Sequence, residues 1–273
     1  MNPRQLLIKA TGYNFEHYNT TYDYAGSVAQ VPLADTRTSF GFTYDSDSLN
    51  PFVYALRQLL SRGTEQEAAA AVCRYLDTFR ATSLADVANV EPTAYPDLAS
   101  MKIPPRRVPF HTLHIGMPWA KSMHVPCATR SQRSADVTRD QLKIALGQLR
   151  RLGQTYKSIR CHGLRTGGGR SEPRHNFICA STLTDGKRRR HVILSGQHRV
   201  AALSLLGFHM IPTIPTPHFI PQVERDNASM WPIVRLQALQ AASALRLFDS
   251  FFAHRRSADK QYGLDNFSSP LHA

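Results

Sequence analysis

The apolar and polar positions are most regular in the stretch that ends at residue 214. An apolar, β-prone run at residues 192–194 stops at Ser195-Gly196, and helical spacing begins at once. Gly207 then stands where a helix commonly ends in a left-handed cap, and residues 210–214 are β-prone again. The pattern predicts a strand, a glycine turn, a helix over 197–206 and a returning strand.

The N-terminal part, residues 1–100, has the spacing of amphipathic helices. Asn50-Pro51 predicts a capped helix start ahead of an apolar face, and Thr64 with Glu67 forms a capping-box pattern that predicts a second helix reaching about residue 79. A third, shorter helix begins near residue 83. Alternation over residues 38–44 predicts a short strand.

The central and C-terminal parts are separated from these helices by a proline-rich linker at residues 91–105. The elements expected there are a strand at 108–113, a long basic loop at 116–137, an amphipathic helix at 138–152, a strand at 156–161, a hairpin of 177–183 with 191–194 around Asp185-Gly186, and a long helix over 231–252. The predicted fold is therefore α+β. A central domain with a small mixed sheet, residues 106–217, lies between an N-terminal helical region, 1–100, and a C-terminal helical extension, 218–273.

Composition and charge indicate a globular protein with one strongly basic region. The chain has 273 residues, 42% of them hydrophobic, and a net charge of +13. Residues 101–200 hold 20 Lys and Arg against four acidic residues, so the positive field is concentrated there and should attract nucleotides or polyanions. Four scattered cysteines without a Cys-x-x-Cys pair favour neither a disulfide framework nor a zinc ribbon. No apolar run is long enough for a membrane span, so we expect a cytoplasmic protein.

The turn at Ser195-Gly196 has the chemistry of an anion site. A glycine at a strand-to-helix junction lets a ligand approach the backbone, and the first N–H groups of a helix are free to bind an anion. His198 and Arg199 follow in the first turn, where two donor side chains would close around a phosphate. The alternative is an ordinary packed β-α-β junction with His and Arg at its surface.

The residues Ser195-Gly196-Gln197-His198-Arg199, with Val-Ala-Ala-Leu and Gly207 after them, resemble the signature of the ParB/sulfiredoxin superfamily. The resemblance covers residues 108–215 and implies a nucleotide-phosphate site, which holds CTP in ParB partition proteins and ATP in sulfiredoxin and free serine kinases. The Asn50-Pro51 helix start and the segment 231–252 also resemble the flanks of ParB-like proteins encoded among bacterial glycan-assembly genes.

The chain also departs from each branch of that superfamily. Gln197 stands where sulfiredoxin has its nucleophilic cysteine, so sulfinic-acid reduction by that route is not expected. Residues 112–119 contain no carboxylate to match the acidic base of the serine kinases, and the Gly-Glu-Arg-Arg box of ParB is altered. The resemblance thus implies the phosphate cradle without the chemistry attached to it.

The leading hypothesis is an ATP-binding, kinase-like phosphotransferase that acts on a small molecule or glycan precursor. The expected ligands of ATP (or CTP) with Mg²⁺ are Ser195, Gly196, Gln197, His198, Arg199 and Arg170. His198 and Arg199 would neutralise charge on the transferred group, with Asp140 as the catalytic carboxylate. Asp136 and His114 are the other candidate bases, and all three have ordinary structural explanations. No metal ligand of the protein itself is predicted.

Two basic clusters flank the expected hairpin, and each has both a binding and a structural interpretation. The glycines between Arg165 and Arg170 would fold over phosphates or form a plain hairpin tip. Residues 187–190, Lys-Arg-Arg-Arg, would contact a nucleic-acid or sugar-phosphate backbone or form a charged edge that opposes aggregation. Only one of the two clusters is expected to border the ligand. A DNA-binding ParB-like protein, using the basic central segment, and a nucleotide-gated scaffold without catalysis are the alternative functions.

Overall fold

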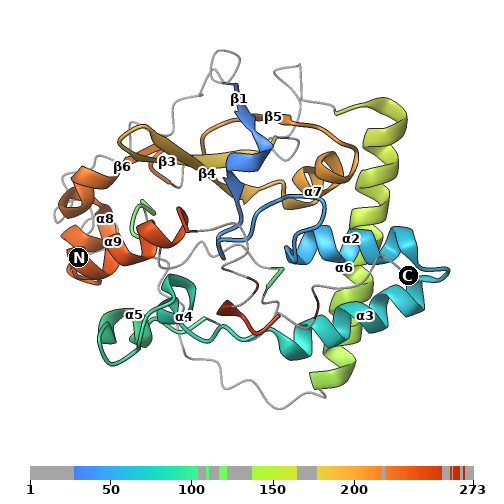
Figure 1. Cartoon of the computed structure of the whole chain (residues 1–273), viewed down its shortest axis with the longest axis horizontal. Coiled ribbons are helices and arrows are strands. Elements are labelled where there is room, and N and C mark those ends of the chain that lie inside the picture. The colour runs from blue at the N-terminus through green and yellow to red at the C-terminus, as the bar shows by residue number, and fades with distance from the viewer. Residues whose placement is uncertain are drawn as a thin grey trace, which may run out of the picture.

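The computed structural model describes residues 28–103, 109–110, 117–121, 137–164, 177–216, 219–253, 259, 261–264 and 267, without the side chains of 137–140. These residues form helices around two small sheets, so the predicted α+β class is confirmed (Figure 1). None of the helices in these ranges combines the length and the apolar character that crossing a bilayer requires. Of the strand predicted at 108–113, only residues 109–110 are described, and they form a turn; most of the basic loop lies outside the described residues.

The main sheet has four strands in the order β2 (Thr36–Arg37), β4 (Arg188–Ser195), β3 (Cys179–Asp185) and β6 (Gln222–Glu224). β3 and β4 are antiparallel, whereas β2 with β4 and β3 with β6 are parallel, so the sheet is small and mixed, as predicted. The predicted hairpin is confirmed, and Gly186 takes φ +58° at its two-residue turn. The returning strand β5 (Met210–Thr213) also forms, but it pairs with β1 (Ala29–Pro32) in a separate ribbon.

One hydrophobic core lies between the sheet and four helices at the right of Figure 1. These helices are α2 (Pro51–Ser61), α3 (Glu65–Thr78), α6 (Val137–His162) and α7 (Gln197–Leu205). The predicted caps are present: the Asn50 side chain accepts hydrogen bonds from the N–H groups of Phe52 and Val53, and Thr64 forms its capping box with Glu67. Ile193 of β4 and Val200 of α7 are both fully buried in this core, so α7 packs directly on the sheet.

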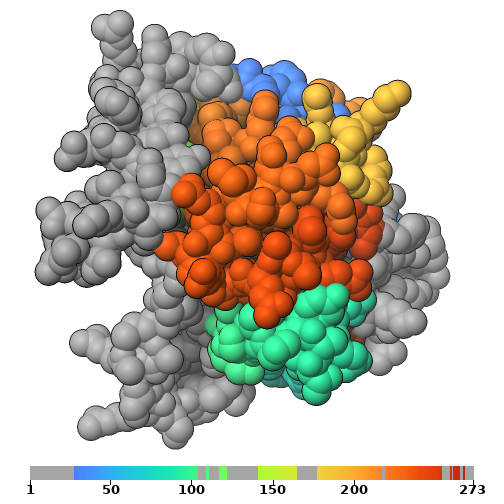
Figure 2. All heavy atoms as spheres, turned by 90° about the vertical axis from the view of Figure 1, so that its left-hand side faces the viewer, coloured from blue at the N-terminus to red at the C-terminus, as the bar shows by residue number. Residues whose placement is uncertain are grey.

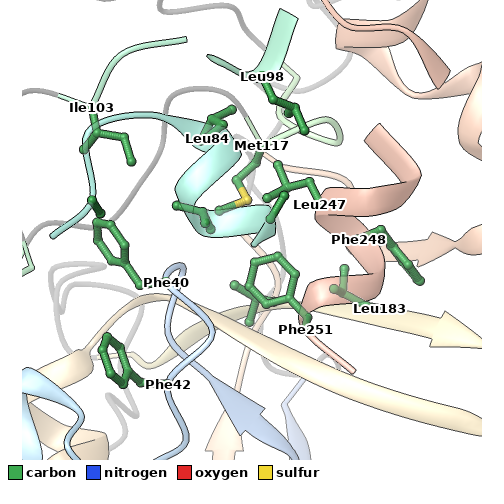
Figure 3. Close-up of a cluster of buried hydrophobic side chains, with 14 of the residues drawn as sticks. Phe40, Phe42, Leu84, Leu98, Ile103, Met117, Leu183, Leu247, Phe248 and Phe251 are labelled. Atoms are coloured by element: carbon green, nitrogen blue, oxygen red, sulfur yellow. The ribbon is translucent and has the colours of Figure 1, made fainter. Parts of the chain in front are cut away.

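A second core, part of which is drawn in Figure 3, covers the opposite face of the sheet. The sheet residues Leu183, Val192 and Val223 belong to it. The elements on this side are α4 (Leu84–Ala88), α5 (Pro96–Ser100), the 3-10 helix η5 (Arg225–Met230), α8 (Pro232–Arg235) and α9 (Ala241–Ser250). Each of the two cores contains residues from both the N-terminal region and the central domain. These two segments therefore fold around shared cores.

The strand predicted at residues 156–161 is wrong, because α6 continues as a helix to His162. Leu149, Leu152 and Ile159 are buried at helical spacing on one face. Gly153 directly follows the helix predicted at 138–152, but it lies inside α6, where an added Cβ would be 3.0 Å from the Leu59 side chain. The glycine thus allows α2 and α6 to approach closely.

The strand predicted at residues 38–44 is also wrong, although its alternating aromatic residues are buried. Gly41 takes φ +83°, and the Gly41 N–H donates to the Thr38 carbonyl at 3.0 Å, so the segment is a tight turn. Phe40 and Phe42 enter one core and Tyr44 the other. The alternation therefore reflects a loop between two cores, and the strands lie earlier, in β1 and β2.

The long helix predicted over 231–252 is broken into α8 and α9 by Gln237, which has φ +58°. α9 then begins where a carboxylate from α5 caps it: Asp97 accepts from the Gln240 N–H at 2.8 Å and from the Ser243 hydroxyl at 2.6 Å. Part of the predicted basic loop is instead core, because Trp119 is buried edge-to-face against Trp231 at 5.8 Å between ring centroids.

Candidate functional site

The junction between β4 and α7 has the geometry that the sequence predicts. β4 ends at Ser195, Gly196 is the N-cap residue with φ +87°, and α7 begins at Gln197. The Gly196 carbonyl accepts the first helical hydrogen bonds, from the N–H groups of Arg199 at 2.9 Å and Val200 at 3.1 Å. The strand, turn and helix are therefore confirmed as one unit.

Glycine is required at position 196 because of the local backbone and a close contact with Ile178, and not because a ligand approaches it. Besides its positive φ, a Cβ added there would lie 3.0 Å from the Ile178 Cα and 3.1 Å from its Cγ1. The space that the missing side chain leaves is thus filled by the segment entering β3. An approaching ligand would meet the N–H groups of the first turn of α7 and not this side of Gly196.

The start of α7 is electrostatically unusual. A helix N-terminus carries a partial positive charge and usually has a polar side chain as cap or an acidic residue in its first turn. α7 has neither: its cap is glycine, its first turn has no acidic residue, and that turn carries Arg199. The positive charge of Arg199 lies close to the positive end of the helix dipole, which is unfavourable. A bound anion would be attracted to both and would offset this repulsion.

Arg199 is half-buried beside the first residues of β3. Its Nη1 donates to the Phe177 carbonyl at 3.2 Å. Burial lowers the pKa of Arg199, and the nearby Cys179 thiol opposes this shift. Cys179 lies opposite Ser195 in the β3–β4 register, and burial raises its pKa while Arg199 lowers it. Arg199 therefore places a positive charge at the strand end, between the turn and β3.

His198 points elsewhere, into the helices. Its Nε2 hydrogen-bonds with Gln148 Oε1 of α6 at 2.7 Å, and its ring meets Phe52 of α2 edge-to-face at 5.2 Å. Burial, together with the charges of Arg151 and Arg199, lowers the pKa of His198 to about 4. The imidazole is therefore neutral at pH 7 and joins three helices, so Arg199 supplies the charge that the sequence assigned to both residues.

The other predicted site residues are not placed by the structure. Asp140 belongs to the first turn of α6, but its side chain lies outside the described residues. Arg170 and the candidate bases Asp136 and His114 also lie outside them. What the structure brings together is the contiguous set 195–199 with two residues that sequence reasoning missed: Cys179, the first residue of β3, and Phe177, two positions before it. The predicted hairpin carried a signal for Cys179, because a two-residue turn places it beside the end of β4.

The chain matches no family model, no curated protein and no solved structure. The resemblance to the ParB/sulfiredoxin superfamily therefore remains a prediction that depends on residues 195–199. Within the part of the chain that the structure describes, no group of three His, Cys, Asp or Glu residues has the arrangement to hold a metal ion.

The basic run at the hairpin is partly neutralised by ion pairs. Arg188 pairs with Asp185, and Arg190 pairs with Asp35 at 2.6 Å. Both guanidinium groups also lie over the Phe252 ring, at 5.2 and 5.7 Å from its centroid. These two arginines are therefore held by the fold. Lys187 and Arg189 form no ion pair within the described ranges.

Proposed function

We propose that the chain binds the phosphates of a nucleotide at the turn formed by residues 195–199. The observation that carries this proposal is the first turn of α7, which has a glycine cap, no acidic residue and a half-buried arginine. Backbone N–H groups at a helix start and a guanidinium are complementary to phosphate, the latter in a bidentate manner. A phosphate would also offset the desolvation of Arg199.

The reaction that we propose is phosphotransfer from ATP to a small molecule or glycan precursor. Arg199 would stabilise the charge that develops on the transferred group, a role that needs positioning and electrostatics more than covalent chemistry. Mg²⁺ would enter with the nucleotide, because it is commonly bound through phosphates and one or two carboxylates. His198 has no charge to contribute and would hold the orientation of α7.

Isothermal titration calorimetry with ATP, CTP, GTP and ADP, each with and without Mg²⁺, tests the binding step. Arg199→Ala should weaken the preferred nucleotide by about 1.5–3 kcal/mol, or roughly 10- to 150-fold, the scale of a hydrogen bond to a charged group. Arg199→Lys keeps the charge but loses the planar fork, so its loss should be partial. Arg160→Ala, an exposed residue of α6, is the control and should change nothing.

The outcomes separate the proposal from its alternatives. Binding of every nucleotide unchanged by Arg199→Ala, or no nucleotide binding at all, would contradict a phosphate site at this turn. Duplex binding with a steep salt dependence and no nucleotide affinity would favour a DNA-binding protein. Nucleotide binding without phosphate release or transfer from labelled ATP would favour a nucleotide-gated scaffold.

A further inference from the structure

The main sheet has a hollow of about 700 Å³ on the face that carries α7, beyond the point where α7 covers it. Its floor is the half of the sheet next to the hairpin turn, and all four residues of β1 contribute to its wall. Figure 2 shows the hairpin (gold) protruding at the upper right, beside the blue atoms of the segment that begins with β1. This size is typical of a pocket for a small ligand.

The strand register explains why the floor is polar. Thr182 faces His191 across the hairpin and Gln222 on β6, and Thr184 likewise faces Arg189 and Glu224. Side chains alternate between the faces of a sheet, so these pairs share one face. The same face continues under α7 as Ala180 and Ile193, which are buried in the core. The sequence of β3 and β4 thus changes from apolar to polar where the helix cover ends.

The charges lining the hollow are mainly positive. Four Lys or Arg residues, 187–190, and two carboxylates, Asp35 and Glu224, line it. Arg188 and Arg190 are engaged by Asp185 and Asp35, which leaves Lys187 and Arg189 without an ion-pair partner in the described parts of the chain. An anion in the hollow would pair with Lys187 and Arg189.

The neutral and acidic side chains next to these cations are suited to bind the hydroxyl groups of a ligand. The Thr182 hydroxyl is 3.1 Å from Nδ1 of His191, and burial, with the charges of Arg189 and Arg190, lowers the pKa of that histidine against the opposing effect of Asp35. Gln222 and Glu224 are exposed at the opposite side of the floor. Amide and carboxylate oxygens accept hydrogen bonds from hydroxyl groups, which a polyhydroxy compound presents in several directions.

We propose that this hollow binds a sugar phosphate, with its phosphate at Arg189 and Lys187 and its hydroxyls at Gln222 and Glu224. The site is independent of the turn at residues 195–199, because seven residues of extended chain separate Arg189 from Gly196, roughly 23 Å at ~3.3 Å per residue. One mononucleotide does not reach both. A nucleic-acid backbone fits the hollow less well, since it would bring phosphates against Asp35 and Glu224.

Titration calorimetry with glucose 1-phosphate, glucose 6-phosphate and ribose 5-phosphate tests this proposal, with glucose, inorganic phosphate and a 20-base-pair duplex as comparison ligands. At least one sugar phosphate should bind at least tenfold more tightly than both glucose and inorganic phosphate. Arg189→Glu should weaken it at least 30-fold. Lys157→Glu, the same charge change on an exposed residue of α6, should leave it within twofold.

Two further variants test the assignment of the hydroxyl side and the independence of the two sites. Glu224→Gln should weaken the sugar phosphate about fivefold and leave inorganic phosphate unchanged or slightly tighter. Arg199→Ala should leave sugar phosphate binding unchanged, whereas it weakens nucleotide binding. Melting temperatures of all variants establish that they fold, and Arg189→Gln replaces Arg189→Glu if the latter does not.

The opposite results overturn the proposal. One is that none of the three sugar phosphates binds at millimolar concentration. A second is that Arg189→Glu and Lys157→Glu reduce sugar phosphate affinity equally. A third is that the duplex binds more tightly than any sugar phosphate and that Arg189→Glu abolishes this duplex binding.

Discussion

Replacing Gly196 by alanine should destabilise the protein through two effects that the structure separates. The first is the left-handed backbone, φ +87°, which costs a residue with a side chain about 1–2 kcal/mol. The second is the contact of the new methyl group with the Ile178 Cα at 3.0 Å, a distance that only a backbone shift relieves. Overpacking of this kind costs about 1–3 kcal/mol, so the total should be about 2–5 kcal/mol.

Gly207 provides the matched control for this substitution. It has nearly the same backbone, φ +80°, but an added Cβ would meet nothing within 4 Å. Gly207→Ala should therefore cost only the backbone effect, about 1–2 kcal/mol. Urea unfolding of both variants at pH 7 measures the difference, which should be at least about 1 kcal/mol. If the two variants lost equal free energy of unfolding, the close approach of residues 178 and 196 would be refuted, and with it the placement of the turn against β3.

Three other predictions concern the pKa of His198, the packing of Trp119 and the cap of α9. The pKa of His198 falls from 6.5 to about 4 on folding, so the unfolded chain binds the proton first and the protein loses stability as pH falls from 6.5 toward 4. Relative to His198→Gln, the wild type should lose about 2–3 kcal/mol between pH 7 and 4.5 in urea titrations, and an equal pH dependence of the two proteins would contradict this. The buried Trp119 indole has no hydrogen-bond partner among the described residues, so Trp119→Phe should cost about 1–2 kcal/mol against about 3–5 kcal/mol for Trp119→Ala in the same assay, and similar losses would count against it. Asp97→Ala should cost about 1–2 kcal/mol by removing the cap of α9, and protection of the first amides of α9 from hydrogen exchange should fall with it; unchanged protection would contradict the capping role.

The elements that the sequence predicted well carry their signals locally. Asn50, Thr64 and the Asp185-Gly186 turn each act on residues within a few positions, and all three form as expected. The strand-turn-helix unit around Gly196 belongs to the same class. Where neighbouring residues decide the conformation, the local sequence pattern is sufficient to predict the element.

The elements that were predicted wrongly depend on contacts between distant segments. Gly153 is compatible with a helix end or with a helix crossing, and only the presence of Leu59 on α2 decides between them. The start of α9 depends on Asp97, which is more than a hundred residues away in the sequence. Such partners are set by tertiary packing, which periodicity does not encode.

The turn at residues 195–199 lies where the sequence predicts it, but the directions of its side chains were not predicted. Residues 195–199 were identified from the turn, whereas the direction of each side chain depends on what packs around it. His198 faces Gln148 and Phe52 because α7 lies against α6 and α2, and no motif distinguishes that from an orientation toward a ligand. The polar hollow, likewise, exists only because β6 joins β3 in parallel and brings Gln222 and Glu224 beside the hairpin.

The most direct test of the nucleotide site is a titration of nitrogen-15-labelled protein with Mg·ATP, followed through backbone amide chemical shifts. If phosphates bind at the start of α7, the largest changes should occur at the amides of Gln197 and His198, because anions at a helix N-terminus bind its first N–H groups. Arg199→Ala should reduce these changes at the same ligand concentration. Changes centred on residues 187–191, or no change at the start of α7 at saturating nucleotide, would contradict the proposed site.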